Sequence, residues 1–280
     1  MNKRVLSLTL LLACLGLMTM QAEGRKVESF NSGWSFKKAP AEKELAINAP
    51  KWDKGWSEVE IPHTWNAKDM QVQANSFYEG AAYYKKQYFF PAELKDKRVF
   101  LRFEGVGSCA EVFVNGMLAT SHKGGYSAFA CEISPLLKAG EENEIIVKAD
   151  NKSRPDVIPV NHNLFGVYGG IYRPVWLVVT EPCNISVTDC ASPGVYVTQK
   201  NVSKKQADVK VKVKLDNGTL QPVPVTLQNT IYDQEGKQVA THSQSFELSA
   251  QGEQAYESSF TIKKPTLWQG RENPYLYKVV

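Results

Sequence analysis

Short runs of alternating apolar and polar residues dominate the chain after residue 23, and helical periodicity is almost absent. The β-rich runs of the first half lie at 83–90, 98–104, 110–114, 144–150 and 175–179. The third of these runs ends in Asn115-Gly116, a strong signal for a tight hairpin turn. Many short strands at regular spacing predict an all-β domain, either a sandwich or a jelly roll, over residues 23–180.

The pattern changes near Glu181-Pro182, which predicts a domain boundary at that point. From Ala207 to Leu215, valines alternate strictly with lysines, so we expect a half-buried strand with a lysine-coated outer face. Further β-rich runs follow at 223–233, 238–248, 254–262 and 275–280. About seven short strands within residues 181–280 are typical of an immunoglobulin-like sandwich. The last run stops without a polar cap, so we expect this domain to be cut at its last strand and the chain to be the N-terminal part of a longer protein.

The first 22 residues are expected to form a secretory signal peptide. Lys3 and Arg4 supply a charged start, and the apolar run 5–17 has the length of a signal core but is short for a membrane span. Cleavage is expected after Ala22. The alternative is a lipoprotein signal, in which Cys14 at the end of a loose lipobox would carry the lipid.

Export would permit disulfides, and four cysteines follow the leader: Cys109, Cys131, Cys183 and Cys190. They allow three full pairings, between which the sequence does not choose. Cys109 and Cys131 lie inside strand-like runs, where a free cysteine behaves as a small buried hydrophobe. We therefore expect free thiols for at least this first pair.

Composition and charge narrow the class of protein. The chain has 33 basic and 29 acidic residues, a formal net charge of +4, and loss of Lys3 and Arg4 with the leader would leave 31 against 29. A near-neutral balance argues against a nucleic-acid partner, which requires a concentrated basic stripe. The hydrophobic share of 43% and the charged share of 22% are those of an ordinary globular protein and exclude a disordered chain.

Most catalytic signatures are missing from the sequence. The four histidines are far apart and form no HxH or HExxH pattern, so no zinc site is predicted. There is no GxSxG nucleophile elbow. Gly105-Val106-Gly107 joins two strands and precedes no helix, which excludes a phosphate loop. The sequence therefore predicts no metal and no cofactor.

Carboxylates in turn-like segments are harder to assign. Glycoside hydrolysis needs two carboxyl groups about 5–10 Å apart, a distance that sequence spacing does not reveal. Glu79 and Asp53 both lie in turn-like segments. Most such acids are solvated surface groups, but Glu79, in Tyr78-Glu79-Gly80, is kept as a candidate substrate contact.

Two segments combine aromatic, polar and glycine residues, at 61–66 and 161–176. For most of their residues we favour packing and tight turns, with Arg173 as a structural cation that pairs with a carboxylate. Asn161, His162 and Asn163 are the exceptions. A polar cluster before a glycine-rich turn suits hydrogen bonding to sugar hydroxyls.

Several ordered motifs in these regions resemble glycoside hydrolase family two, which holds β-galactosidases, β-glucuronidases and β-mannosidases. They are IPHTWN (61–66), YEGAAYYKK (78–86), LRFEGVGSCAEVFVNG (101–116), HKGGYSAF (122–129), YGGIYRPVWL (168–177) and LWQGRENPYLY (267–277). The resemblance implies a galactose-binding-like jelly roll, then an immunoglobulin-like domain, then a TIM barrel that carries both catalytic glutamates. Such a barrel needs roughly 250 residues beyond those present, so the resemblance implies that it is missing from this chain and that the chain alone is inactive.

The resemblance also implies a role for the loop before YGGIYR. In this family an Asp shortly before that motif touches the sugar, but Leu164 stands at the closest position, so Asn163 or Asn161 would have to substitute for it. The predicted substrate-binding residues are therefore Asn161, His162, Asn163 and Glu79.

The function implied is that of the N-terminal part of a secreted retaining β-glycosidase, most similar to β-galactosidases, in a bacterial periplasm. Its partners would be a carbohydrate substrate, the catalytic barrel of the same protein and possible further copies of the chain. A free-standing carbohydrate-binding protein and an adhesion or scaffold protein are the alternatives. Four Asn-x-Ser/Thr sequons, at Asn151, Asn184, Asn201 and Asn217, would matter only in a eukaryotic secretory pathway.

Overall fold

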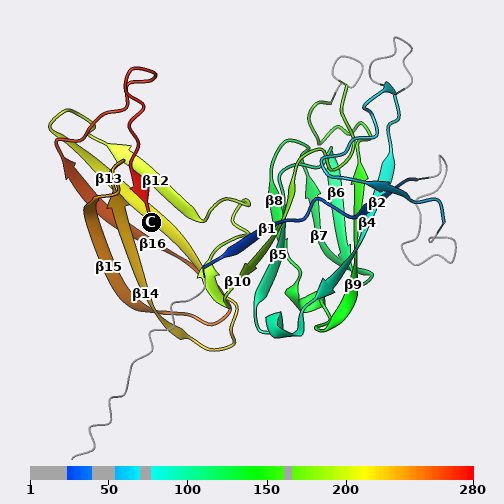
Figure 1. Ribbon diagram of the computed structural model, residues 1–280, viewed down its shortest axis with the longest axis horizontal. Helices are drawn as coiled ribbons and strands as arrows, with labels where there is room; N and C mark the ends of the chain where they lie inside the picture. Colours follow the sequence, from blue (N-terminus) through cyan, green and yellow to red (C-terminus); the bar gives the residue numbers. More distant parts are fainter. Residues whose placement is uncertain (1–23, 40–53, 70–76, 161–165) are drawn as a thin grey trace, which may run out of the picture.

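The computed structural model describes residues 24–39, 54–69, 77–160 and 166–280, which form two β-sandwiches side by side (Figure 1). These residues contain no α-helix, and the complete helical elements among them are the 3₁₀ turns η2 (Ala92–Leu94) and η3 (Ser134–Leu136). The all-β class is therefore confirmed, and no barrel of alternating strands and helices lies within the described residues.

The first sandwich consists of two antiparallel sheets. Its strands are β1 (Lys26–Ser29), β2 (Trp34–Lys38), β3 (Ser57–Val59), β4 (Ala81–Phe90), β5 (Arg98–Phe103), β6 (Cys109–Val114), β7 (Met117–Lys123), β8 (Phe129–Glu132), β9 (Glu141–Asp150) and β10 (Val175–Thr180). One sheet has the order β3-β2-β4-β9-β6-β7, and the other has the order β1-β10-β5-β8. This is the jelly-roll-like sandwich that the sequence predicts.

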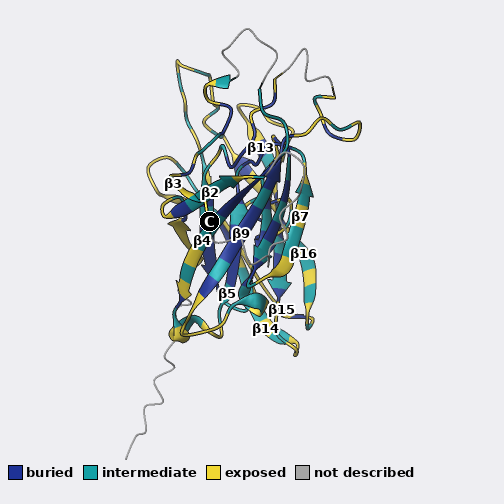
Figure 2. Ribbon diagram, turned by 90° about the vertical axis from the view of Figure 1, so that its right-hand side faces the viewer, coloured by how far each residue is buried: buried dark blue, intermediate teal, exposed yellow. Residues whose placement is uncertain are grey.

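Alternation along the strands builds the core of this sandwich. Successive side chains of a strand point to opposite faces, so every second residue of β5 and β6 enters the space between the sheets. Leu101, Phe103, Val112 and Val114 are fully buried there. Figure 2 shows buried residues along the central strands, β9 among them. Burying one such side chain stabilises the fold by about 1.5–3 kcal/mol.

Strand β9 begins three residues before the predicted start at 144. The extension follows from its partner, because the long strand β4 pairs with β9 as far as Phe90, which lies opposite Glu141.

The predicted hairpin is confirmed: Asn115 and Gly116 connect β6 to β7 with φ angles of 50° and 80°.

The second sandwich has seven strands within the described residues, as predicted. They are β11 (Cys183–Ile185), β12 (Val195–Lys200), β13 (Gln206–Asn217), β14 (Val223–Tyr232), β15 (Gln238–Leu248), β16 (Gly252–Lys263) and β17 (Lys278–Val279). Strands β11, β12 and β16 all pair with β13, and β15-β14-β17 form the facing sheet. The valines of β13 are buried and its lysines face outward, which confirms the half-buried strand.

The last strand is much shorter than the predicted run 275–280, which is wrong in this respect. Lys278 and Val279 pair with β14, at Tyr232 and Ile231, and Val280 exchanges two backbone hydrogen bonds with Thr230. Beyond Tyr232 the partner chain turns away, because the N–H of Asp233 donates to the carbonyl of Lys237. The residues before Lys278 consequently have no strand to pair with.

The two sandwiches meet through an apolar contact and a buried cation. Phe100 and Val178 of the first sandwich pack against Val187 of the second. Arg98 contacts Glu132 through two hydrogen bonds of 3.1 and 2.6 Å, and its Nη1 lies 3.0 Å from Oδ2 of Asp216 across the junction. Because the Arg98 side chain is only 13% exposed, both carboxylates meet its charge where water screens it weakly.

The four cysteines among the described residues are free thiols, which confirms that expectation for Cys109 and Cys131. Cys131 is buried, and burial raises the pKa of its thiol to about 12. Cys109 is half-buried rather than buried, and Cys190 is exposed.

The hairpin yields a stability prediction. Gly116→Val should lower the Tm by about 3–6 °C, because a β-branched residue at positive φ costs about 1–2 kcal/mol. Thermal unfolding followed by circular dichroism would measure the change. Met117→Val, which adds a β-branched residue at the neighbouring strand position, is the control and should leave the Tm nearly unchanged. An unaltered curve for Gly116→Val would contradict the strain argument.

Candidate functional site

The predicted substrate contacts fall into two groups. Asn161, His162 and Asn163, together with Leu164, lie outside the described residues. Glu79 is half-buried and lies between two residues, Tyr78 and Gly80, whose backbones are fixed by hydrogen bonds. The structure therefore defines the surroundings of the predicted loop, and the contacts themselves stay predictions.

A pair of fully buried asparagines, Asn66 and Asn151, joins four segments at one end of the first sandwich. The Asn66 Oδ1 accepts hydrogen bonds from the N–H of Gly169 (2.8 Å) and from Asn151 Nδ2 (3.2 Å). Asn151 Nδ2 also donates to the carbonyl of Val167 (2.9 Å), and its Oδ1 accepts from the N–H of Gly80 (2.9 Å). Buried polar groups are stable only when paired, and here each amide satisfies several backbone groups at once.

This amide pair fixes the backbone around both predicted contact regions. Val167 and Gly169 follow the segment 161–165, and Gly80 follows Glu79. Asp69 completes the network by accepting hydrogen bonds from Asn66 Nδ2 (3.1 Å) and from the N–H of Tyr78 (3.0 Å). Sequence reasoning did not find this pair: Asn66 was part of a recognised motif, but nothing local distinguished Asn151 from a surface sequon.

Burial also shows which of the four sequons could not carry a glycan in the folded chain. Asn151 and Asn217 are fully buried, so neither side chain is accessible to a glycan in the folded chain.

Aromatic side chains of the 61–66 motif pack beneath the network. Trp65 is buried, and its Nε1 donates to the carbonyl of Tyr78. A Cβ at position 169 would overlap the Trp65 ring, which is why glycine is needed there. These contacts support the packing interpretation of this motif.

His63 belongs to the same packed layer. Its Nδ1 lies 2.8 Å from the hydroxyl of Tyr84. Burial, and then the nearby Lys38, lower the pKa of His63, while burial raises the pKa of Tyr84. Both effects favour the neutral imidazole, and His63 is a half-buried residue that pairs with the Tyr84 hydroxyl.

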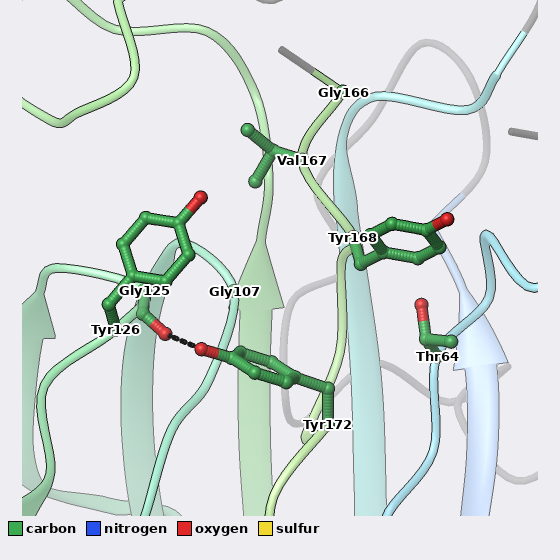
Figure 3. Close-up of a pocket in the computed structure, with 8 residues that line it drawn as sticks. All are labelled: Thr64, Gly107, Gly125, Tyr126, Gly166, Val167, Tyr168 and Tyr172. Atoms are coloured by element: carbon green, nitrogen blue, oxygen red, sulfur yellow. Dashed lines mark hydrogen bonds between the residues drawn. The ribbon is translucent and has the colours of Figure 1, made fainter.

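A small pocket of about 270 Å³ opens beside the amide pair (Figure 3). Its walls come from four loops and are formed by Thr64, Gly107, Gly125, Tyr126, Gly166, Val167, Tyr168 and Tyr172. The rings of three tyrosines surround the space, and the Tyr172 hydroxyl donates to the carbonyl of Gly125. Tyr126 and Tyr168 are 56% and 47% exposed, so their rings are available to a ligand.

The close approach of two loops shapes this pocket. The N–H of Gly107 donates to the carbonyl of Gly170 (2.9 Å), and a Cβ on Gly107 would collide with the carbonyl oxygen of Tyr168. Aromatic faces with hydroxyl groups at their edges suit a sugar ring, which offers an apolar C–H face and hydrogen-bonding hydroxyls. The pocket volume is just below the range of about 300–1,000 Å³ that is usual for ligand sites, which leaves room for one small ring.

Arg173 does not form the predicted carboxylate pair within the described residues. Its Nη1 instead donates to the carbonyl of Tyr126 (3.3 Å), and its guanidinium lies over the Tyr172 ring, 5.3 Å from the centroid. The arginine thus supports two tyrosines of the pocket.

Neither a metal-binding cluster nor a membrane-spanning helix is found in the described parts of the chain. Those residues hold no group of three or more His, Cys, Asp or Glu side chains arranged to bind a metal ion. Nor do they form a helix that is long and apolar enough to cross a membrane.

Comparison with known protein families shows to which family the chain belongs. The family model described as "Glycosyl hydrolases family 2, sugar binding domain" matches residues 27–182, more than half of the chain. The chain belongs to glycoside hydrolase family two. A second model, described as "Glycosyl hydrolases family 2", matches residues 193–280. The resemblance noted in the sequence motifs is thereby confirmed.

Known members of family two extend well beyond this chain. A β-glucuronidase from Bacteroides fragilis is 40% identical over 225 residues, which are 79% of this chain and 31% of that protein. A solved structure from Bacteroides fragilis, provisionally assigned as a β-galactosidase, is 71% identical to this chain and superposes with a TM-score of 0.88. The match covers 91% of this chain and 38% of the chain in that structure. A Bacteroides uniformis β-glucuronidase structure is 30% identical with a TM-score of 0.84, covering 91% and 30% respectively. The chain thus spans about a third of the length of these relatives.

The amide pair yields the second prediction. Asn151→Ala should destabilise the chain by about 3 kcal/mol or more, because it leaves several buried backbone groups unpaired, and should lower the Tm by about 6–12 °C. The control is Asn273→Ala, which removes one hydrogen bond, to the carbonyl of Leu267. Thermal unfolding of both variants would measure the difference, and equal shifts would show that the pair has no special role.

Proposed function

We propose that this chain is the N-terminal part of a longer, retaining β-glycosidase whose catalytic carboxylates lie on a C-terminal barrel. The observation that carries the proposal is that both family-two models match this chain, while the relatives are about three times longer. The absence of any α-helix from the described residues agrees with a barrel elsewhere in the protein. In this view the two sandwiches support the substrate site and help to shape it.

The end of the first sandwich that carries the amide pair is the proposed meeting point with the barrel and the substrate. Four exposed apolar or aromatic side chains lie on the loops of this end: Tyr126, Ile158, Val160 and Tyr168. Exposed apolar groups that gather around a pocket are typical of a surface that contacts a ligand or another domain. Glu79 and the segment 161–163 flank backbone that the amide pair holds in place.

For the substrate we propose a β-galactoside, supported by the provisional assignment of the 71% identical structure. The second candidate is a β-glucuronide, supported by the 40% identical relative. The two sugars differ in charge, because glucuronate carries a carboxylate where galactose carries a neutral hydroxymethyl group. A free-standing carbohydrate-binding protein remains the alternative if the gene encodes no barrel.

Export of the protein is also proposed, through a signal peptide at residues 1–22 and into a bacterial periplasm. Lipid attachment at Cys14 is the alternative, and mass spectrometry of the protein from cell envelopes would distinguish a free N-terminus after residue 22 from a lipid-modified cysteine.

The third prediction tests whether catalysis requires the part of the protein beyond this chain. The chain by itself should hydrolyse neither nitrophenyl β-galactoside nor nitrophenyl β-glucuronide, because a binding surface without a positioned carboxylate pair does not activate a glycosidic oxygen. The complete gene product should cleave one of them. Hydrolysis by the chain alone, lost in Glu79→Gln, would overturn the proposal, and so would a complete product that has no barrel.

The fourth prediction addresses the loop. In the complete enzyme, Asn163→Ala should raise KM about three- to tenfold, since a hydrogen bond to a neutral hydroxyl contributes about 0.5–1.5 kcal/mol. The Tm should change little. Asn273→Ala, on the second sandwich, is the control and should leave KM unchanged. A lower Tm with an unaltered KM would mean that Asn163 only stabilises a turn.

A further inference from the structure

The positive charge of the chain is concentrated on one sheet of the second sandwich. Residues 195–217 and 252–264, which contain β12, β13 and β16, carry eight lysines and four acids. The rest of the chain carries 25 basic and 25 acidic residues, so these two segments account for the whole net charge of +4. A chain that is near neutral overall therefore presents one basic region.

Strand register gathers these lysines on a common outer face. Lys210 of β13 lies opposite Thr198 of β12 and opposite Ser259 of β16. Directly opposed residues point to the same side of a sheet, and residues two apart on one strand do so at a spacing of about 7 Å. We call this surface the lysine face. It is formed by Thr198, Lys200, Lys210, Ser259, Thr261 and Lys263, all of them exposed.

A groove of about 530 Å³ runs over the lysine face, lined by Lys200 and Lys210 and by the hydroxyl residues Thr198, Ser259 and Thr261. Within the part of the chain that the structure describes, Lys200 and Lys263 form no ion pair with a carboxylate. Lys210 pairs with Glu257 at 2.6 Å, but both side chains are about half exposed. Exposed pairs of this kind contribute little and exchange readily with other anions.

Opposing charge on this face is limited. Asp208 is the only acid that lines the groove, and its carboxylate is occupied by hydrogen bonds from Asn201 Nδ2 (2.8 Å) and the Thr261 hydroxyl (2.9 Å). Lys214, at the far end of β13, is neutralised by Asp189 and Glu253. The free positive charge therefore lies at the end of the sheet that holds Lys200 and Lys263.

Three further lysines extend the positive region beyond the strands. Lys204 and Lys205 precede β13, and Lys264 follows β16. The N–H of Lys264 donates to the carbonyl of Lys205 (2.8 Å), so the two connecting segments are held together. All three side chains are exposed.

We propose that the lysine face binds an anionic polysaccharide, with its carboxylate or sulfate groups on the lysines and its hydroxyls on Thr198, Ser259 and Thr261. The complementarity is twofold, because the groove offers cations for the acidic groups and hydroxyl partners for the neutral part of each sugar. The lysine face would contact the polymer at a place separate from the tyrosine pocket. This binding does not depend on the proposed hydrolysis, and each can be tested without the other.

A polysaccharide fits this surface better than the other polyanions. The face is a sheet without a protruding helix or ribbon that could enter a DNA groove, and the groove lining offers hydroxyls and no aromatic ring exposed for base stacking. The groove also lacks an exposed apolar side chain to insert into a membrane. DNA and anionic vesicles are therefore useful competitors.

Isothermal titration calorimetry with the chain tests the proposal. The probes are polygalacturonate, which carries carboxylates, chondroitin sulfate, which carries both groups, and a neutral galactan. We expect binding to at least one acidic polymer at low ionic strength, weakening with added salt, and none to the galactan. Lys200→Gln/Lys263→Gln should weaken the binding about tenfold, and Asp208→Asn should strengthen it two- to threefold.

Lys237→Gln/Lys278→Gln, which removes the same charge from the turn before β15 and from β17 of the facing sheet, is the matched control and should bind as the unmodified chain does. Both lysine pairs are exposed, so circular dichroism should show unchanged folding. The proposal is overturned if neither acidic polymer binds, if the two double variants lose affinity equally, or if DNA or vesicles with anionic lipid bind as tightly as the polysaccharide.

Discussion

The buried amide pair of Asn66 and Asn151 is the interaction on which the loop end of the first sandwich depends. Four segments leave their strands there, and their backbone groups no longer pair within a sheet. An apolar core cannot satisfy such groups, whereas an amide side chain both donates and accepts. The two side chains bond to Gly80, Val167 and Gly169, and through them they fix the backbone next to the predicted contact regions.

Close packing turns this fixed backbone into a site. Glycine at 169 lets the chain lie directly on Trp65, and glycine at 107 lets a second loop touch the carbonyl of Tyr168. Tyr126 and Tyr168 consequently project from loops that these contacts hold in place, and Arg173 donates a hydrogen bond to the carbonyl of Tyr126. Loops held by packing and hydrogen bonds keep the geometry of a binding surface, which supports the proposed sugar contact at this end of the molecule.

Charged residues have two different roles at the junction and on the second sandwich. At the junction, Arg98 is enclosed between Glu132 and Asp216, where charge holds two domains together. On the outer face of the sheet, Lys200 and Lys263 remain open to solvent and to an acidic ligand. The overall charge of the chain conceals this contrast, because the rest of the sequence is balanced almost to zero.

Local features of the sequence were sufficient for the fold class. Alternation, the Asn115-Gly116 turn and the valine-lysine strand depend on neighbouring residues, and ordered motifs identified the family. The start of β9 and the shortness of β17 were decided by their partners, β4 and β14, because a strand extends only as far as another strand pairs with it. The amide pair, the tyrosine pocket and the lysine face each unite residues far apart in the chain. Such sites exist only after the sheets have formed, since hydrogen bonds and charge act across distances in space that sequence spacing does not encode.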